Sequence, residues 1–244
     1  MNRPNERSLK ILIALLSIAI ILLSIVTFLT KHGFSIKNIF PNTIVSDFSM
    51  QPIEPPPAVI IDAGHGGWEP GAINGSIQEK DVTLDIALQV EKILIKKEIS
   101  YLMIRNDDTY ISLEDRVITA NEKACKLYVS IHNNSFSDPA QRGVLTAYNP
   151  FSESGKDIAK IMQSKIGDLC KRNRDIMPRP NLIVLRYTNM PAILVEIGFI
   201  SNNQDLKLIT DAEFQKKCAN QIVLGIEDIL AKYFPDELKS SVEH

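Results

Sequence analysis

The segment Ala58–Gly67 reads AVIIDAGHGG and predicts a strand followed by a tight turn. Its first half is a short apolar run rich in β-branched residues, which is typical of a buried strand. Its second half surrounds His65 with glycines, which allow a loop to fold back sharply with its backbone close to a ligand. Because sites in open α/β sheets lie just beyond the carboxyl ends of strands, His65 is a candidate functional residue.

Short β-rich runs alternate with amphipathic segments along the rest of the chain. This alternation predicts a single α/β domain: a twisted, mostly parallel or mixed sheet of about six strands with helices on both faces. The five further strands that we expect are Tyr101–Arg105, Leu127–Ile131, Gly143–Asn149, Leu182–Arg186 and Ala192–Glu196.

Three apolar stripes with helical spacing separate or follow these strands. They run from Ile86 to Leu94, from Ile158 to Leu169 and from Phe214 to Ile229. Capping-box patterns predict helix starts at Ser112, with Asp115, and at Thr210, with Glu213. The folded domain therefore extends over residues 58–234, and residues 235–244 form a C-terminal tail.

The N-terminal part predicts a membrane anchor. Residues 11–29 carry no charge and are long enough to cross a bilayer core. No small-residue cleavage motif follows them, which favours an uncleaved signal anchor over a signal peptide. Arg3, Arg7 and Lys10 precede the run, so residues 1–10 are expected in the cytoplasm. The domain would then lie on the extracytoplasmic side of the cell membrane, on a Pro-rich stalk formed by residues 30–57.

Composition and motifs exclude several other classes. A formal net charge of -2 gives no basic excess for nucleic-acid binding. The chain contains no phosphate-binding GxxxxGK[ST] or GxGxxG motif and no GxSxG nucleophile elbow. The three cysteines form no CxxC pair, which argues against a thiolate zinc site, and Cys170 and Cys218 occupy apolar helical positions expected in the core.

The chain has four histidines, and two of them, His65 and His132, follow expected strands. Imidazole and carboxylate are the ligands of hydrolytic zinc sites, which usually hold three protein ligands and a water. Glu79, at the start of the helix after the first glycine-rich loop, is the best-placed third ligand. Spacing alone leaves four competing carboxylates: Asp62, Glu69, Asp81 and Asp85.

Glu196 ends the apolar run Ala192–Val195 and is expected to be a half-buried carboxylate at the sheet edge. Burial raises the pKa of a carboxyl group, as a general base that later donates its proton requires. The alternative is a structural ion pair, with Arg186 as a partner.

At these residues the chain resembles the zinc-dependent N-acetylmuramoyl-L-alanine amidases of the third amidase family. The resemblance implies zinc ligands at His65, Glu79 and His132, a catalytic Glu196, and cleavage of the amide between N-acetylmuramic acid and the L-alanine of the stem peptide in peptidoglycan. It covers nearly the whole domain through IDAGHGG, PGA (70–72), EKDVTLDIA, SLEDRVITAN, LYVSIHNNS and NLIVLRYTNMPAILVEIGFISN.

A short anchored domain without wall-binding repeats resembles the sporulation-associated members, which prepare spore cortex peptidoglycan for muramic-lactam formation. A housekeeping role in daughter-cell separation is the alternative. Some relatives insert a helix that plugs the zinc cleft, but the connection after Asn134 is too short for one, which leaves the cleft open to substrate or to a wall-associated regulatory protein. Two other classes remain as alternatives: an inactive wall-binding scaffold, and a zinc peptidase acting on the stem peptide.

Overall fold

The computed structural model describes residues 55–239, with side chains to 237, and eleven residues between 15 and 31: 15–18, 20, 21, 24, 25, 27, 28 and 31. Residues 1–54 and 55–244 form separate units. The expected cytoplasmic segment, nine of the nineteen residues of the expected membrane helix and most of the expected stalk lie outside the described residues. Within the described residues, no helix has the length and hydropathy needed to cross a membrane.

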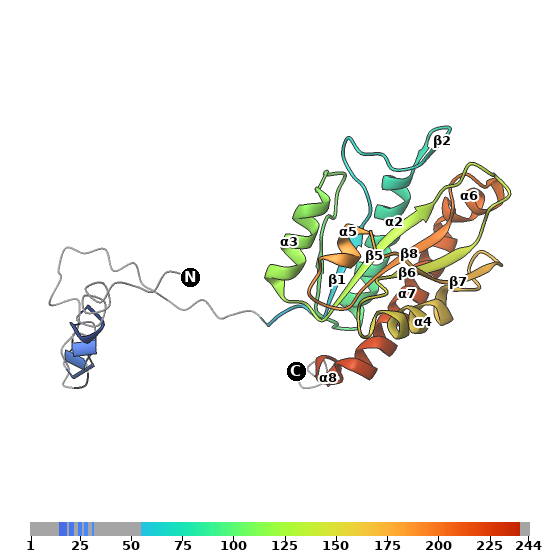
Figure 1. Cartoon of the computed structure of the whole chain (residues 1–244). Coiled ribbons are helices and arrows are strands. Elements are labelled where there is room, and N and C mark those ends of the chain that lie inside the picture. The colour runs from blue at the N-terminus through green and yellow to red at the C-terminus, as the bar shows by residue number, and fades with distance from the viewer. Residues whose placement is uncertain are drawn as a thin grey trace. The chain divides into compact units, whose positions relative to one another are not determined.

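A six-stranded sheet forms the centre of residues 55–239, in the order β4-β1-β5-β8-β6-β7 (Figure 1). Four strands run parallel to one another, and β6 and β7 are parallel to each other but run opposite to β8, so the sheet is mixed as expected. The strands are β1 (Val59–Ala63), β4 (Tyr101–Met103), β5 (Leu127–Asn134), β6 (Val144–Tyr148), β7 (Asn173–Pro178) and β8 (Ala192–Phe199).

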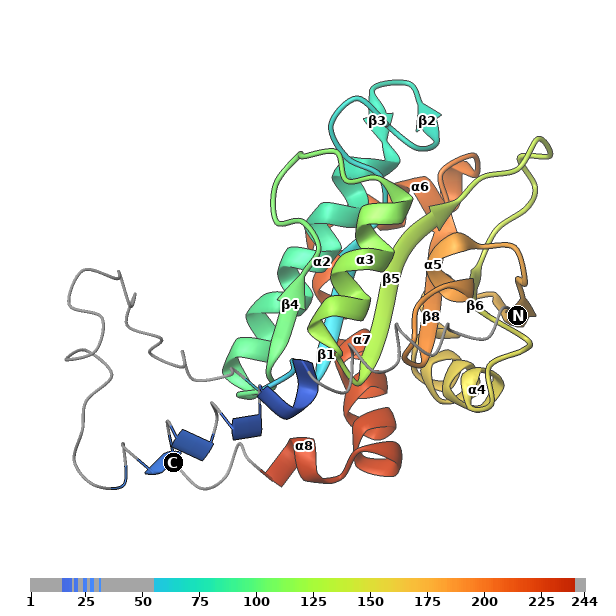
Figure 2. The same ribbon diagram turned by 60° about the vertical axis from the view of Figure 1, so that its left-hand side comes forward.

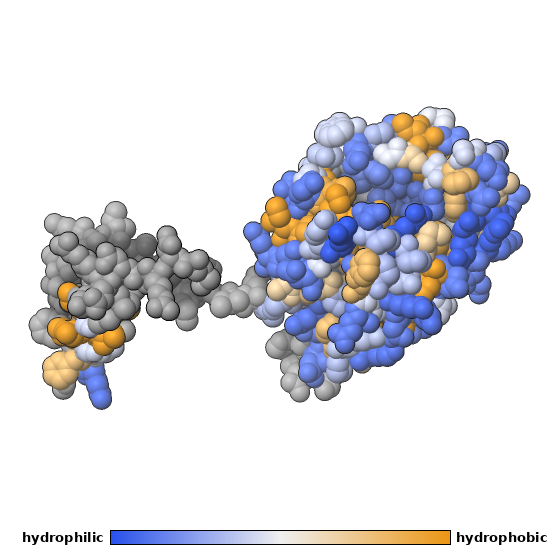
Figure 3. Space-filling model, viewed as in Figure 1, coloured by the Kyte–Doolittle hydropathy of each residue, from blue (hydrophilic) through white to orange (hydrophobic). Residues whose placement is uncertain are grey.

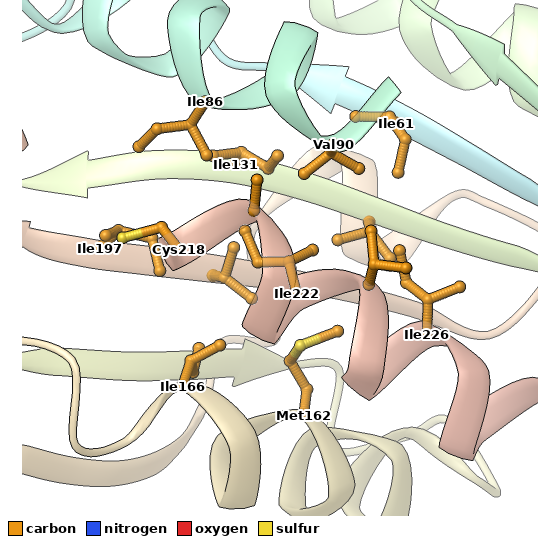
Figure 4. Packing of buried hydrophobic residues seen from close by; sticks show 14 of the residues in the cluster. Ile61, Ile86, Val90, Ile131, Met162, Ile166, Ile197, Cys218, Ile222 and Ile226 are labelled. Atoms are coloured by element: carbon orange, nitrogen blue, oxygen red, sulfur yellow. The ribbon is translucent and has the colours of Figure 1, made fainter. Parts of the chain in front are cut away.

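Helices cover both faces of this sheet, because successive side chains of the buried strands point to opposite sides. In β1, Ile61 joins the larger apolar core and Ile60 the smaller one. The larger core lies under α2 (Glu79–Lys96), α4 (Gly155–Ile166) and α7 (Ala212–Tyr233), and Figure 4 shows Ile86, Met162 and Ile222 of these helices packed around it. The smaller core lies under α3 (Leu113–Lys123) and α5 (Ile183–Arg186), which Figure 2 shows on one side of the sheet.

The segment Leu182–Arg186 was expected as a strand, and this prediction is wrong: most of it forms the single helical turn α5. Both edges of β8 are already paired, to β5 and to β6, so the segment has no place beside it. It instead covers the smaller core with Val184 and Leu185, which are buried. An apolar run of five residues is too short for its periodicity to distinguish a strand from a helix.

The sixth strand of the sheet is β7, whose polar sequence NRDIMP at the sheet edge shows no apolar alternation. A two-stranded hairpin, β2 (Ile73–Asn74) and β3 (Ile77–Gln78), precedes α2. The short helix α8 (Asp236–Lys239) lies in the expected C-terminal tail.

Two helix starts were predicted from capping boxes. Ser112 caps α3 as expected, since its Oγ accepts a hydrogen bond from the Asp115 backbone N–H at 3.0 Å. The cap of α7 is Asp211, which accepts from Phe214 N–H at 2.8 Å. Thr210 instead ends an unpredicted helix, α6 (Asn203–Ile209), so the expected cap was one residue early.

The remaining predictions about the core and the cleft are confirmed. All three cysteines are buried with free thiols, and Cys170 and Cys218 belong to the larger core. Residues 135–143, which join β5 to β6, contain no helix, so no plug of the kind found in some relatives lies there.

Candidate metal and catalytic site

The carboxyl ends of β1 and β5 bring His65, Glu79 and His132 together. His65 follows β1 in a left-handed backbone conformation (φ 62°), Glu79 is the first residue of α2, and His132 lies near the end of β5. Figure 2 shows the β2–β3 hairpin, which lies between His65 and Glu79 in sequence, at the same end of the domain as the arrowhead of β5.

Two glycines are required by the close packing of these side chains. A Cβ at position 64 would lie 2.3 Å from the His132 ring. A Cβ at position 71 would lie 2.6 Å from both Glu79 Oε2 and His65 Cδ2. The glycines of the loop therefore let its backbone pass directly against the site, as the sequence predicted.

One ligand atom from each of His65, Glu79 and His132 lies within 4.8 Å of the others. His65 Nε2 is 3.2 Å from Glu79 Oε2, and His132 Nδ1 is 2.9 Å from Glu79 Oε1. The two imidazole rings meet edge to face, with centroids 4.9 Å apart. The buried His65 Nδ1 has no hydrogen-bond partner. Two imidazoles and a carboxylate converging on one point fit the donor set of a hydrolytic zinc site.

Backbone groups hold the Glu79 carboxylate in place. Its Oε2 accepts from Ala72 N–H at 2.9 Å, and its Oε1 accepts from Asn133 N–H at 3.1 Å. Burial alone would raise the Glu79 pKa, but the hydrogen bonds and charges of His132 and His65 outweigh it and hold the pKa well below its usual range. Burial conversely opposes protonation of His132, and the bond to Glu79 overcomes it, so the His132 pKa is raised. The carboxylate is thus ionised and ready to bind a cation.

The four competing carboxylates have other environments. Asp62 is committed to buried partners: Arg116 donates to Oδ1, and Tyr128 and Ser130 each donate to Oδ2 at 2.7 Å. Burial favours protonation of Asp62, but Arg116 and these hydroxyls lower its pKa. Glu69 Oε2 lies 3.7 Å from His65 Nδ1 and its side chain is 43% exposed, so it borders the site. The other two, Asp81 and Asp85, are exposed.

Two buried arginines that the sequence analysis missed fix the loop after β1. Arg116 donates to the carbonyl oxygens of Ala63 at 2.9 Å and His65 at 2.7 Å. Arg105 donates to the carbonyl oxygens of Ala63 at 2.9 Å and Gly64 at 2.8 Å. A signal existed for one of them, because Arg116 shares a helix face with the apolar Val117 and Ala120. These arginines position the backbone that carries His65.

Glu196 lies on β8, in register with His132 on β5. Its Oε2 is buried without a hydrogen-bond partner. Burial, reinforced by the negative charge of Glu79 and opposed by His132, raises the Glu196 pKa to about 7. The alternative ion pair with Arg186 is not formed: Arg186 is exposed, with its guanidinium 5.4 Å from the ring centroid of Tyr187. A carboxyl group with this pKa beside the candidate ligands is suited to proton transfer.

Two clefts lie near the site, and two of the candidate ligands line one of them. One, of about 160 Å³, is lined by His65, His132 and Asp62 together with apolar residues of α3, α5 and β8: Leu113, Ile183, Val184 and Leu194. Figure 3 shows hydrophobic residues gathered over α3 and α5. The second, of about 240 Å³, is lined by Asn134, Phe136, Leu145, Arg174, Arg179 and Phe199.

Residues 59–228 match the family model described as N-acetylmuramoyl-L-alanine amidase. A solved N-acetylmuramoyl-L-alanine amidase from Clostridium difficile 630 is 37% identical, with a TM-score of 0.70 over 73% of this chain and 99% of that one. The CwlD amidase from Clostridioides difficile, solved in complex with the GerS lipoprotein, is 30% identical, with a TM-score of 0.68 over 71% and 98%. The germination-specific N-acetylmuramoyl-L-alanine amidase of Bacillus subtilis is 28% identical over 73% of this chain and 80% of its own length. The chain therefore belongs to the N-acetylmuramoyl-L-alanine amidase family of peptidoglycan hydrolases.

Proposed function

We propose that this amidase is zinc-dependent, with His65, Glu79 and His132 as the ligands and Glu196 as the general base. The reaction is hydrolysis of the amide that joins the lactyl group of N-acetylmuramic acid to L-alanine. The observation that carries the proposal is the convergence of the three ligand atoms within 4.8 Å, next to a buried carboxylate oxygen with no partner.

A zinc ion held by His65, Glu79 and His132 would supply Lewis-acid activation of a water and of the scissile amide. Glu196 would receive the proton of the attacking water, since burial already favours its protonated form. It then passes the proton to the amide nitrogen as L-alanine leaves. The hydrogen bonds of Arg105 and Arg116 to the loop hold His65 in position during these steps.

Product analysis tests the proposal against its alternatives. Purified residues 55–239, which lie within the compact unit of residues 55–244, would be incubated with peptidoglycan with and without added zinc. Released stem peptides that begin with L-alanine, formed only with zinc, support the proposal. Cleavage inside the stem peptide would indicate a zinc peptidase, and absence of products with zinc bound would indicate an inactive scaffold.

We further propose a role in the spore cortex, where the amidase would prepare peptidoglycan for muramic-lactam formation. The similarity to a germination-specific amidase supports this role. The similarity to CwlD, solved with a lipoprotein, supports control by a wall-associated partner. The test is to measure muramic lactam in spores of a strain from which the gene for this protein has been deleted. Loss of the lactam supports the cortex role. A normal lactam content together with chained vegetative cells supports the housekeeping alternative.

The proposed location is the extracytoplasmic face of the cell membrane. The uncharged run 11–29 would span the bilayer as an uncleaved anchor, and the cationic flank before it would keep the N-terminus inside. The stalk of residues 30–57 would then place the site within reach of glycan near the membrane.

A further inference from the structure

The single tryptophan of the chain lies on the loop that carries His65, and its side chain is exposed. Trp68 is 74% exposed, although tryptophan side chains are highly buried on average in folded proteins. Its indole packs on the Tyr110 ring, with centroids 4.4 Å apart and planes inclined by 36°. Trp68, three residues from a candidate metal ligand, is thus exposed while it packs on a half-buried tyrosine, and core packing does not account for its position.

The loop around Trp68 is fixed at several points. Gly66 and Glu69 exchange backbone hydrogen bonds of 3.0 and 3.1 Å, so Trp68 lies within a tight turn. Asp108 accepts from Gly67 N–H at 2.8 Å and from Lys80 Nζ at 2.7 Å, and Lys80 also donates to the Gly67 carbonyl at 2.8 Å. The ring is therefore presented on a braced loop, which lowers the entropy cost of binding a ligand there.

Trp68 and Tyr110 lie close in sequence to residues of the cleft that the scissile amide must enter. Glu69, the next residue after Trp68, and Leu113, three residues after Tyr110, line the same cleft as His65 and His132. In the substrate, only a lactyl group separates the scissile amide from the muramic acid ring. A sugar ring of the glycan strand must consequently lie close to the rim of this cleft when the amide reaches the site.

The chemistry around Trp68 fits a sugar ring. A pyranose has a C–H face that stacks on an aromatic ring and hydroxyl groups at its edge that form hydrogen bonds. Glu69 adjoins Trp68 in sequence, and Asp108 accepts a hydrogen bond from Gly67 N–H on the other side of Trp68; Asp107 and Asp108 are exposed. Acidic neighbours disfavour insertion into an anionic lipid surface.

We propose that Trp68, supported by Tyr110, is a stacking platform for a pyranose ring of the peptidoglycan glycan strand. The proposal rests on amide cleavage at the neighbouring site, because that reaction brings the glycan to this loop. Stacking fixes the strand relative to His65 and directs the stem peptide across the metal ligands.

Fluorescence tests the proposal directly, because emission from tryptophan in the full-length chain comes only from Trp68. The full-length chain carrying Glu196→Gln, reconstituted in phospholipid vesicles that contain no other protein, would be titrated with peptide-free oligosaccharides of alternating N-acetylglucosamine and N-acetylmuramic acid. We expect a saturable change in emission, and no quenching when brominated lipids replace the ordinary ones. Emission unaffected by the oligosaccharides, or quenching by brominated lipid, would overturn the proposal. Because no turnover is needed, this outcome is independent of whether the amidase mechanism is correct.

Kinetics on glycan-linked substrate provide the second test. Trp68→Ala should lower kcat/KM by about tenfold, with most of the loss in KM, as removal of one stacking contact predicts. Trp68→Tyr should retain most of the parent kcat/KM, because tyrosine keeps an aromatic ring at this position. Phe151→Ala is the matched control: Phe151 is 82% exposed and follows β6, whose end pairs with the start of β8, at the opposite end of the sheet. Equal KM values for Trp68→Ala, Phe151→Ala and the parent would contradict the proposal.

Discussion

Replacement of Arg116 by methionine should destabilise the domain strongly at neutral pH. Arg116 and Asp62 are 2% and 1% exposed, so solvent does not screen their ion pair. Removal of one partner from a buried pair costs about 3–5 kcal/mol, because it leaves the other charge without compensation. Domains of this kind have free energies of unfolding of about 5–15 kcal/mol, so the loss is a large fraction of the total.

The sign of the pH dependence follows from the pKa of Asp62. In the parent, burial raises this pKa, but Arg116 and the hydroxyl donors together lower it by a larger amount, so the net shift is downward. The stabilisation is therefore present above the unfolded pKa of about 3.9 and is lost as pH falls through the folded pKa. In the variant, burial without the cation raises the folded pKa, so Asp62 destabilises the fold above about pH 4 and less below it. The difference between parent and variant should shrink as pH falls from 7 to 4.

Urea unfolding of residues 55–239 at pH 7 and pH 4, with a chelator present, measures this difference. Adding Asp62→Asn to Arg116→Met should recover on the order of 1–2 kcal/mol, because no charge remains buried. Arg186→Met, at an exposed arginine, is the control and should change stability by less than about 0.5 kcal/mol. A loss below about 1 kcal/mol for Arg116→Met at pH 7, or an equal loss at both pH values, would refute the reasoning.

Alanine at any of the three proposed ligand positions (65, 79 and 132) should abolish or greatly weaken zinc retention, measured by metal analysis of purified protein, because three ligands leave no redundancy. Asp81→Ala should retain zinc like the parent, since Asp81 is exposed, and the reverse pattern would displace Glu79 from the ligand set. The rate of amide hydrolysis should fall as pH drops through the pKa of Glu196. Burial raises this pKa to about 7 in the metal-free protein, and a bound cation lowers it. A pH–rate profile with no decrease on the acid side would contradict a carboxylate base. In protoplasts, added protease should remove the catalytic domain while the N-terminus stays protected, and a mature N-terminus beyond residue 30 would show a cleaved signal peptide instead.

The local sequence pattern was sufficient to predict those strands and turns whose structure depends on their own residues alone. The strand β1 and its turn follow from an apolar run that ends in glycines, and β5 and β8 follow from similar runs. Since the carboxyl ends of parallel strands meet at one edge of a sheet, the sequence alone is enough to place His65 and His132 together. The family resemblance then selected Glu79 and Glu196, and the structure brings both to the same end of the sheet.

Features that depend on distant partners could not be predicted in this way. Asp62 competes as a ligand on spacing alone, but Arg116, 54 residues away, donates to it and takes it out of the ligand set. The segment Leu182–Arg186 has strand-like composition, yet it forms a helical turn because β8 has no free edge. The edge strand β7 was missed because its polar sequence lacks an apolar period.

The most direct test of the mechanism compares the parent with Glu196→Gln on peptidoglycan, with zinc content measured in both proteins. The two side chains have nearly the same shape, but the amide cannot accept the proton of the attacking water. We expect about one zinc ion per chain in both proteins, release of peptides that begin with L-alanine by the parent, and a rate lower by roughly two to four orders of magnitude in the variant. A zinc-loaded Glu196→Gln protein that releases the same peptides at a near-parent rate would contradict the mechanism.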